Sequence, residues 1–381
     1  MVIANWEDMR RAARARLPKI FFEYIDGAAF SEQTARANIE DFDRWLLEQN
    51  VLAGVGSRDL SVSYLGRKRP LPMMLGPVGF SGLFSSNGEI KAARAAHRAG
   101  VPFCLSNFGI TSLERLRKAT DGDLWFQLYV MKDRSLSDEF LQRAASAACE
   151  ALVVTVDTTV GGIRERDIRN GFRSAKRLSP GMALRMATKP LWCMDALSAG
   201  LPRIENLQHR PEYGRFVLEQ ASNLGRQIEQ NLAWDDVRRL RDKWSGKFVV
   251  KGVLNARDAE GAAALGADAI VISNHGGRQL DCSPSTITVL PEIVAAVGSK
   301  LDVLIDGGFR RGAQVVKAMA LGAKGVLLGR AYAYALGAGG EAMVSNMLEF
   351  VTAEIDCTIG HMGVTSFSQL GPHAPQYLRQ R

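Results

Sequence analysis

The sequence predicts an α/β protein whose eight βα units close into a (β/α)8 TIM barrel, and three observations lead to that expectation. Short apolar runs recur from residue 70 onward, most are followed by an Ala-rich helical stretch, and successive runs start mostly 22 to 33 residues apart, the length of one βα unit. Eight units in series close naturally into a barrel, and a doubly wound open sheet is the competing arrangement. The runs span residues 72–77, 101–106, 124–130, 151–157, 247–252, 269–274, 302–307 and 325–329.

Residues 1–65, before the repeats, are expected to form an N-terminal helical segment. Trp6 to Leu17 is amphipathic, and Pro18 interrupts the pattern. Ser31 to Leu47 carries Glu, Arg and Asp at spacings typical of a solvated helix face.

The spacing after the fourth apolar run is much longer than the others, because 96 residues separate the starts of the runs at 151 and 247. That is too long for one crossover, so we expect a long loop over about 175–215, after the fourth strand. Residues 341–370 are predicted to form the closing helix. We therefore expect a single domain over 1–381, with the barrel over 70–340.

Composition places the chain among globular proteins. The 381 residues are 46% hydrophobic and 23% charged, which excludes disordered and low-complexity classes. Lys and Arg number 48 against 40 Asp and Glu, which gives a net charge of +8 and a pI near 9.3. Such basicity fits nucleic acid, a membrane surface or a small anionic substrate, and composition alone does not choose among them.

Cysteine usage and the N-terminal sequence predict an intracellular protein. The five cysteines are widely spread and form no C-x-x-C pair, so neither a disulfide framework nor a metal site is expected. The first residues are charged and lack the apolar core of a signal peptide. No stretch reaches the roughly eighteen apolar residues of a spanning helix.

Polar residues gather at the ends of the apolar runs, where barrels carry their chemistry. The loops after the seventh and eighth runs combine glycines with arginines, and these loops commonly hold phosphate in barrels. A glycine turn with solvated arginines is the alternative explanation. The candidate phosphate residues are Gly308, Arg310, Gly329 and Arg330.

His275 lies in a Gly-flanked turn with Arg278 three residues on and Asp281 in the same turn. A histidine base beside a fixed cation suits proton removal from an anionic substrate, whereas a lone histidine would more often be structural. Lys251 ends a buried run, where an ammonium group needs a negative partner. A structural ion pair with Asp157 or Asp306 is its alternative role.

Several other signatures are absent or out of place. The stretch from Gly337 to Ala342 matches a relaxed dinucleotide fingerprint, but it follows a helical pattern and leaves too little chain for a βαβ unit. No Walker A loop, H-E-x-x-H or G-x-S-x-G occurs, so phosphate-loop, zincin and serine-hydrolase chemistries lack their motifs.

At these motifs the chain resembles the FMN-dependent L-2-hydroxy acid dehydrogenase and oxidase family. The resemblance runs from about Leu17 to Gly363, and Ser-Asn-His-Gly-Gly-Arg-Gln-Leu-Asp at 273–281 is close to the family's active-site signature. Further matches are Gly-Pro-Val-Gly at 76–79, Trp-Phe-Gln-Leu-Tyr at 125–129, Arg-Glu-Arg-Asp at 164–167 and Asp-Gly-Gly-Phe-Arg-Arg-Gly at 306–312.

The resemblance implies a role for each matching residue. His275 would be the base, Asp157 would stabilise it once protonated, and Tyr129 would hydrogen-bond the substrate hydroxyl. Arg164 and Arg278 would hold the carboxylate with help from Tyr24, and Lys251 would stabilise negative charge on the reduced flavin. The residues implied to line the flavin ring are Pro77, Val78, Gly79, Ser106, Gln127, Thr155 and Ser273. Asp306 and the phosphate candidates named above would take the ribityl chain and the phosphate.

Three departures from the family pattern bear on the reaction. Many members have Ala at Gly79, and Gly leaves room beside the flavin in a way that resembles the dehydrogenase branch more than the oxidases. Ser86-Asn87 replaces a frequent His-Pro. Phe108 occupies a substrate-facing position at which members differ, so it bears on specificity.

The nearest subgroup resembles the membrane-associated mandelate dehydrogenases, followed by respiratory L-lactate dehydrogenases. This implies oxidation of (S)-mandelate to benzoylformate, with electrons passing to a membrane quinone or another carrier. L-lactate oxidation and a soluble oxidase that produces hydrogen peroxide are the alternatives. The resemblance also implies a homo-oligomer, a tetramer.

The long loop holds most of the excess charge. Residues 164–216 carry eleven Lys and Arg against five Asp and Glu, a net +6, with Leu178, Trp192, Met194 and other apolar residues interspersed. Such a mixture predicts peripheral membrane contact over about 178–206, at the cytoplasmic side of the inner membrane, with a solvated loop or active-site lid as the alternative. Nucleic-acid binding is not expected, because no recognition motif or stacking platform accompanies the charge.

Overall fold

Eight parallel strands close into a barrel, which confirms the predicted fold class. The computed structural model describes residues 2–172, 180–198, 200 and 202–381. Each strand pairs with its neighbours in the order β10-β11-β4-β5-β6-β7-β8-β9. The barrel strands are β4 (Met73–Leu75), β5 (Phe103–Ser106), β6 (Leu124–Tyr129), β7 (Ala151–Thr155), β8 (Lys247–Val253), β9 (Ala269–Ile272), β10 (Asp302–Ile305) and β11 (Gly325–Leu328).

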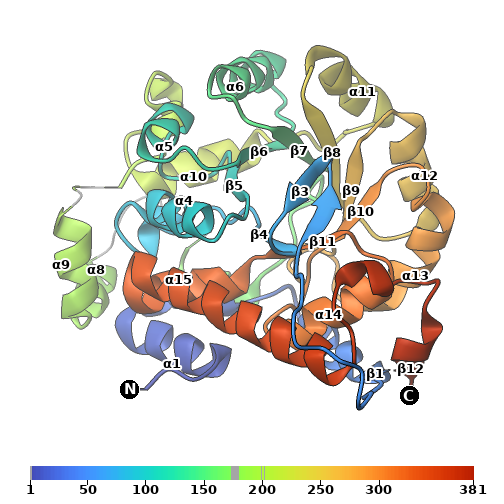
Figure 1. Ribbon diagram of the computed structural model, residues 1–381. Helices are drawn as coiled ribbons and strands as arrows, with labels where there is room; N and C mark the ends of the chain where they lie inside the picture. The colour runs from blue at the N-terminus through green and yellow to red at the C-terminus, as the bar shows by residue number, and fades with distance from the viewer. Residues whose placement is uncertain (1, 173–179, 199, 201) are drawn as a thin grey trace.

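The barrel strands are buried on both faces, as parallel strands under a helical layer are. Every residue of β7, β9 and β11 is buried. The covering helices are α4 (Gly88–Arg98), α5 (Leu113–Ala119), α6 (Arg134–Ser146), α11 (Trp234–Lys243), α12 (Ala256–Ala264), α13 (Thr286–Val297), α14 (Gly312–Ala320) and α15 (Arg330–His361), and Figure 1 shows them around the strands.

The N-terminal segment is helical only in its first part. Helices α1 (Trp6–Arg16), α2 (Lys19–Asp26) and α3 (Gln33–Glu40) are followed by the 3-10 turn η1 (Asp41–Arg44). The helix expected through Leu47 is wrong at its end, because β1 (Trp45–Leu47) pairs antiparallel with β12 (Leu378–Gln380). A further hairpin joins β2 (Val62–Tyr64) to β3 (Arg67–Arg69).

The predicted closing helix is the second half of α15 (Arg330–His361), and it ends at His361, before the predicted residue 370. Helix α15 starts at Arg330, directly after β11, and bends at Gly339 and Gly340, whose backbone angles are not helical. This bend explains the glycine-rich stretch that mimics a dinucleotide fingerprint. Helix α15 crosses one end of the molecule beside α1 (Figure 1). After it come η5 (Phe367–Gln369) and η6 (Pro375–Tyr377).

The insertion after β7 carries helices of its own. Helix α7 (Glu165–Asn170) precedes α8 (Pro180–Ala187) and α9 (Pro190–Ser198), and η3 (Glu205–Leu207), η4 (Pro211–Tyr213) and α10 (Val217–Arg226) lead back to α11. Helices α8 and α9 lie at the left edge of Figure 1, outside the helical layer of the barrel. Leu178, part of the predicted contact segment, lies outside the described residues.

The connection after β4 runs from the barrel towards this insertion. It contains the 3-10 turn η2 (Ser81–Leu83) and ends at α4. Ser81 Oγ donates to the Val78 carbonyl at 3.1 Å. The buried Glu89 carboxylate accepts from the Gly82 and Ile110 amides, so the loops after β4 and β5 are tied together.

Candidate active site

A cavity of about 490 Å³ lies at the carboxyl ends of the barrel strands, where parallel-barrel enzymes carry their sites. Seventeen of the candidate residues line it. Gln127, Asp157 and Ser273 lie directly behind, where they contact lining residues. The lining candidates are Tyr24, Pro77, Val78, Gly79, Ser106, Phe108, Tyr129, Thr155, Arg164, Lys251, His275, Arg278, Asp306, Gly308, Arg310, Gly329 and Arg330.

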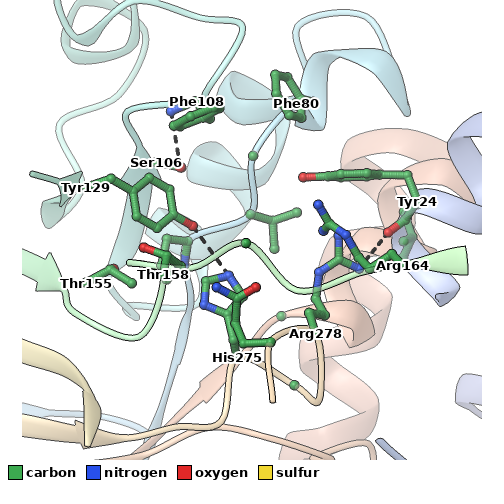
Figure 2. A pocket seen from close by; sticks show the side chains of 18 of the residues that line it. Tyr24, Phe80, Ser106, Phe108, Tyr129, Thr155, Thr158, Arg164, His275 and Arg278 are labelled. Carbon is green, nitrogen blue, oxygen red and sulfur yellow. Dashed lines mark hydrogen bonds between the residues drawn. The ribbon is translucent and has the colours of Figure 1, made fainter. Parts of the chain in front are cut away.

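His275 is held between an acid and a phenol. Its Nδ1 lies 2.9 Å from Asp157 Oδ1, and its Nε2 lies 3.4 Å from the Tyr129 hydroxyl (Figure 2). Burial alone would raise the pKa of Asp157, but His275 and Lys251 outweigh it and keep that pKa below its ordinary value. Asp157 is therefore ionised and fixes Nδ1 as the protonated nitrogen, which leaves Nε2 to accept a proton from the cavity.

The turn that carries His275 needs a backbone that few residues adopt. His275 has φ +57, and Gly276 and Gly277 have φ +65 and +74. A side chain at Gly276 would collide with the Arg330 guanidinium, and one at Gly277 would meet the Ala35 backbone at 2.6 Å. The two glycines therefore let the turn pack against the N-terminal helices while it presents the imidazole to the cavity.

Two guanidinium groups face His275 across the cavity (Figure 2). Arg278 lies 4.8 Å and Arg164 5.6 Å from the centre of the Tyr24 ring. Arg278 also donates to the Tyr24 and Gly27 carbonyls, and Arg164 contacts Asp167 at 3.0 Å. Two cations and a phenol fixed this way suit a carboxylate, because guanidinium N–H groups match its two oxygens.

Burial raises the pKa of Tyr129 well above its ordinary value. Its hydroxyl therefore keeps its proton at neutral pH and serves as a hydrogen-bond donor and acceptor. It points to the same side of the cavity as His275, so a hydroxyl group bound between the two residues would contact both.

Lys251 is a buried ammonium group with partners on both sides. Its Nζ lies 2.9 Å from Asp306 Oδ2 and donates to Ser273 Oγ at 2.8 Å. Burial lowers the pKa of Lys251, but Asp306 and then Asp157 outweigh it, so the net pKa is raised. The ion pair that the sequence left as an alternative therefore exists, and Lys251 also lines the cavity as a fixed positive charge.

The end of the cavity at β10 and β11 is positively charged. Arg310 is buried, and burial lowers its pKa. Its guanidinium donates to the Phe309 carbonyl at 2.7 Å and lies over the Trp6 and Tyr334 rings, and within the described residues its Nε has no hydrogen-bond partner. Burial, and then the nearby Arg278, lower the pKa of Arg330 to about 10. Buried arginines of this kind fit a phosphate group.

Arg330 has a second task that the sequence did not reveal. Its guanidinium donates to the carbonyls of Ile25, Gly276 and Gly27 at 2.8 to 2.9 Å. It therefore ties the end of α2 and the His275 turn to the start of α15. Nearby, a side chain at Gly329 would meet only Val78 at 4.0 Å, so the backbone there is open to the cavity.

The middle of the cavity fits a planar group with polar edges. Within the described part of the chain, Gln127 Nε2, Thr155 Oγ1 and Asp306 Oδ1 are buried and have no hydrogen-bond partner. Ser106 Oγ donates to Gln127 Oε1 at 2.7 Å. Unpaired buried polar atoms are costly, so this set calls for a ligand with several hydrogen-bonding atoms, as FMN has.

Phe108 walls the substrate side of the cavity. Its ring lies 5.8 Å from Phe80 and 5.3 Å from Tyr129, edge to face in both cases. A side chain at Gly79 would lie 3.2 Å from Phe108 Cβ and 3.5 Å from the Tyr24 hydroxyl. A larger residue at position 79 would therefore press against Phe108.

Some lining residues were missed by sequence reasoning. Helix α10 brings Ala221, Ser222 and Gly225 to the cavity, and Phe172 follows α7 there. None belongs to a motif, and α10 lies within the long stretch that separates the fourth and fifth predicted strands.

Asp281, in contrast, lies away from the cavity. It accepts hydrogen bonds from Thr34 N and Ser31 Oγ and so holds the start of α3 in place. No group of residues in the described ranges has the composition of a metal site.

Comparison with known proteins agrees with this geometry. The model of the FMN-dependent dehydrogenase family matches residues 13–377. The chain belongs to this family. The resemblance seen in the sequence is thereby confirmed, and the protein is an FMN-dependent 2-hydroxy acid dehydrogenase, an oxidoreductase.

Individual relatives differ in the substrate they are named for. An L-lactate dehydrogenase of Caulobacter vibrioides is 42% identical over 97% of both chains. An (S)-mandelate dehydrogenase of Pseudomonas putida is 40% identical over 97% of this chain and 92% of its own. The crystal structure of the monotopic membrane protein (S)-mandelate dehydrogenase matches all of both chains at 39% identity with a TM-score of 0.94.

Proposed function

We propose that this protein binds FMN in the barrel cavity and oxidises a small (S)-2-hydroxy acid, with L-lactate as the first candidate, to the 2-oxo acid. The observation that carries the proposal is the pairing of His275 and Asp157 on one side of the cavity with Arg164, Arg278 and Tyr24 on the other. This arrangement supplies a base and a carboxylate clamp on opposite sides of one small space.

The two sides of the cavity bind different parts of the substrate. Arg278 and Arg164 hold the substrate carboxylate, and the Tyr24 hydroxyl assists them. The substrate hydroxyl then lies between Tyr129 and His275. His275 Nε2 takes a proton from the substrate as C2 is oxidised, and Asp157 stabilises the positive imidazolium that results.

FMN held in this cavity would supply a two-electron acceptor for the oxidation at C2. Pro77, Val78 and Gly79 would line its ring, and Ser106, Gln127, Thr155 and Ser273 would supply hydrogen bonds to it. Lys251, whose buried ammonium group lines the cavity, would counter negative charge on the reduced ring. Asp306, Gly308, Arg310, Gly329 and Arg330 would take the ribityl chain and the phosphate.

Phe108, packed edge to face against Phe80 and Tyr129, borders the cavity where the choice between a methyl and a phenyl substituent can be tested. The greater identity to the L-lactate dehydrogenase supports L-lactate. The competing candidate is (S)-mandelate, which the overall match to the mandelate dehydrogenase structure favours.

The test is anaerobic bleaching of the bound flavin by a panel of L-lactate, glycolate, (S)-mandelate and long-chain 2-hydroxy acids. L-lactate is expected to reduce the flavin fastest. Phe108→Ala should shift the preference towards mandelate, because about 1–3 kcal/mol of discrimination attaches to each methylene-sized change in an apolar pocket. Faster reduction by mandelate in the unmodified protein would reverse the assignment.

The electron acceptor is proposed to be a membrane quinone or another carrier instead of dioxygen. The small residue at Gly79 is the sequence feature behind this choice. Stopped-flow mixing of the reduced protein with air-saturated buffer and with a soluble quinone distinguishes the two acceptors. Fast reoxidation by air with release of hydrogen peroxide would assign the protein to the oxidases.

The insertion is proposed to contact the cytoplasmic face of the inner membrane peripherally. Leu184, Leu191, Met194 and Leu197 expose 65 to 81% of their surface. Arg185 and Lys189 accompany them, and such a mixture suits an anionic lipid surface. Within the described ranges, no helix combines the length and apolar character needed to cross a bilayer.

Sedimentation with vesicles that contain anionic lipid tests this contact at low salt. The double variant Leu191→Glu and Leu197→Glu should stay in the supernatant. Wild-type protein that never sediments would exclude the contact and leave a solvated lid as the alternative. The tetramer stays a prediction, which light scattering in detergent-free buffer tests.

A further inference from the structure

Helix α9 of the insertion is docked directly onto the wall of the active site. Trp192 Nε1 donates to the Leu83 carbonyl at 2.9 Å. The Trp192 ring lies 5.3 Å from the Phe21 ring on α2. One side chain therefore contacts both the β4–α4 connection and α2, and each of these two elements lines the active-site cavity farther along.

Asp195, one turn farther along α9, accepts hydrogen bonds from the same connection. Its carboxylate oxygens accept from the Ser86 amide at 2.8 Å, the Ser86 hydroxyl at 2.7 Å and the Ser85 hydroxyl at 3.0 Å. Lys91 Nζ donates at 3.2 Å, and Arg16 lies 3.8 Å away. The Asp195 side chain is only 17% exposed, so water does not replace these partners freely.

The charge of Asp195 is retained at neutral pH. Burial raises the pKa of this carboxyl, but the hydrogen bonds from Ser86 and the charge of Lys91 outweigh it, and the net pKa is lowered. Charge-assisted hydrogen bonds of this kind hold their partners more firmly than neutral ones.

The partners of α9 lead into the site by two short routes. Along the β4–α4 connection, Phe80 N donates to the Phe108 carbonyl at 3.0 Å, next to Gly79. Along α2, the Phe21 ring lies 6.5 Å from Phe172, and Phe172 lies 4.6 Å from Tyr24. A shift of α9 would therefore displace both Gly79 in the β4–α4 connection and Tyr24 beside the two arginines.

The opposite face of α9 is free for another contact. Met194 and Leu197 are 68% and 81% exposed, whereas Trp192 and Asp195 face the barrel. Residues three apart share one face of a helix, so the docking pair and the exposed pair lie on different sides. Lipid contact and docking onto the active-site wall thus use different faces of one helix.

We propose that Asp195, together with Trp192, is a positioning residue for 2-hydroxy acid oxidation, which clasps α9 to the β4–α4 connection and so sets the positions of Gly79 and Tyr24. The inference rests on the proposed function for its kinetic consequence.

The experiment compares Asp195→Ala with Met194→Ala, a neighbour on the exposed face of the same helix, in full-length protein without lipid. Hydrogen exchange of the amides over residues 78–86 is expected to become faster in Asp195→Ala and to stay unchanged in Met194→Ala. The KM for the best hydroxy acid is expected to rise about tenfold, because small displacements in a site are strongly amplified.

Two further variants keep the test decisive. Asp195→Asn retains the size and one acceptor oxygen and should give an intermediate KM and exchange rate. Ser86→Ala removes one donor from the other side of the clasp and should change both readouts in the same direction.

Faster exchange confined to 190–198, with an unchanged KM, would overturn the proposal. If no variant and no wild-type protein oxidises any hydroxy acid, the proposed function fails. In that case the exchange pattern of residues 78–86 still decides whether the clasp exists.

Discussion

Replacing Asp157 by Asn tests whether a negative charge beside His275 assists the reaction. Asp157 Oδ1 lies 2.9 Å from His275 Nδ1, and Oδ2 has no hydrogen-bond partner among the described residues. Asn has the same size and keeps an acceptor for the Nδ1 proton, so the substitution removes the charge and leaves the geometry.

The expected magnitude follows from the contact. Two unit charges about 4 Å apart attract by about 4 kcal/mol at an effective dielectric of 20. This value is an upper bound for the attraction between the Asp157 carboxylate and a protonated His275. Hydrogen bonds to charged groups contribute about 1.5–3 kcal/mol net. The positive charge on His275 develops only as the proton is taken, so the loss falls on the rate of flavin reduction, by about 10- to 150-fold.

The assay is anaerobic stopped-flow reduction of the bound flavin at saturating hydroxy acid and pH 7. The flavin spectrum and its retention on gel filtration serve as controls, and both should match those of the wild type. A reduction rate within twofold of wild type would refute the reasoning, because His275 would then not gain charge in the step that limits reduction.

Three further substitutions have distinct expected outcomes. His275→Gln should keep its bound yellow flavin while flavin reduction slows by about 10²- to 10⁴-fold, as for loss of a general base, and near-normal reduction in the stopped-flow assay would place the base elsewhere. Arg310→Met should bind FMN about 10- to 100-fold more weakly in a fluorescence titration, because a charged hydrogen bond to phosphate is lost. The thermal stability of the FMN-free variant should not fall below that of the FMN-free wild type, because burial disfavours the Arg310 cation. Asp26 has its pKa lowered from 3.8 to about 2, where burial is outweighed by Arg10 and Tyr334, so Asp26→Asn should lower the free energy of unfolding by about 2 kcal/mol at pH 7.

The sign of the Asp26 effect can be checked by pH. A carboxyl with a lowered folded pKa stabilises the protein fully above its ordinary pKa, and that contribution disappears as pH falls through the folded value. Urea unfolding of wild type and Asp26→Asn should therefore converge between about pH 4 and pH 2. A difference that persists unchanged at pH 2 would show that packing, and not the ion pairs with Arg10 and Arg166, is responsible.

The sequence by itself determined the barrel and most candidates for its site. Strand spacing is a local, repeated pattern, and the carboxyl ends of barrel strands meet at one rim, so residues such as His275, Lys251 and Arg310 could be assigned to one cavity. The glycine-flanked histidine turn was visible because its backbone demands glycine at particular positions.

Only the tertiary structure decided which of these residues touch. Asp157 and His275 are 118 residues apart, and Arg278 meets Tyr24 from 254 residues away. No local periodicity records such pairs, because they depend on how the whole barrel closes. The pairing of β1 with β12, which corrected a predicted helix, has the same cause: a tertiary contact outweighed local propensity.

Tertiary contacts also decided how the insertion packs against the barrel. Its charge and its apolar residues could be counted in the sequence, but the sequence did not show which face of α9 is occupied. Trp192 and Asp195 are half-buried because the β4–α4 connection offers a carbonyl, an amide and two hydroxyls at the matching positions. Complementary hydrogen-bonding groups on two distant segments become visible only when the fold brings them together.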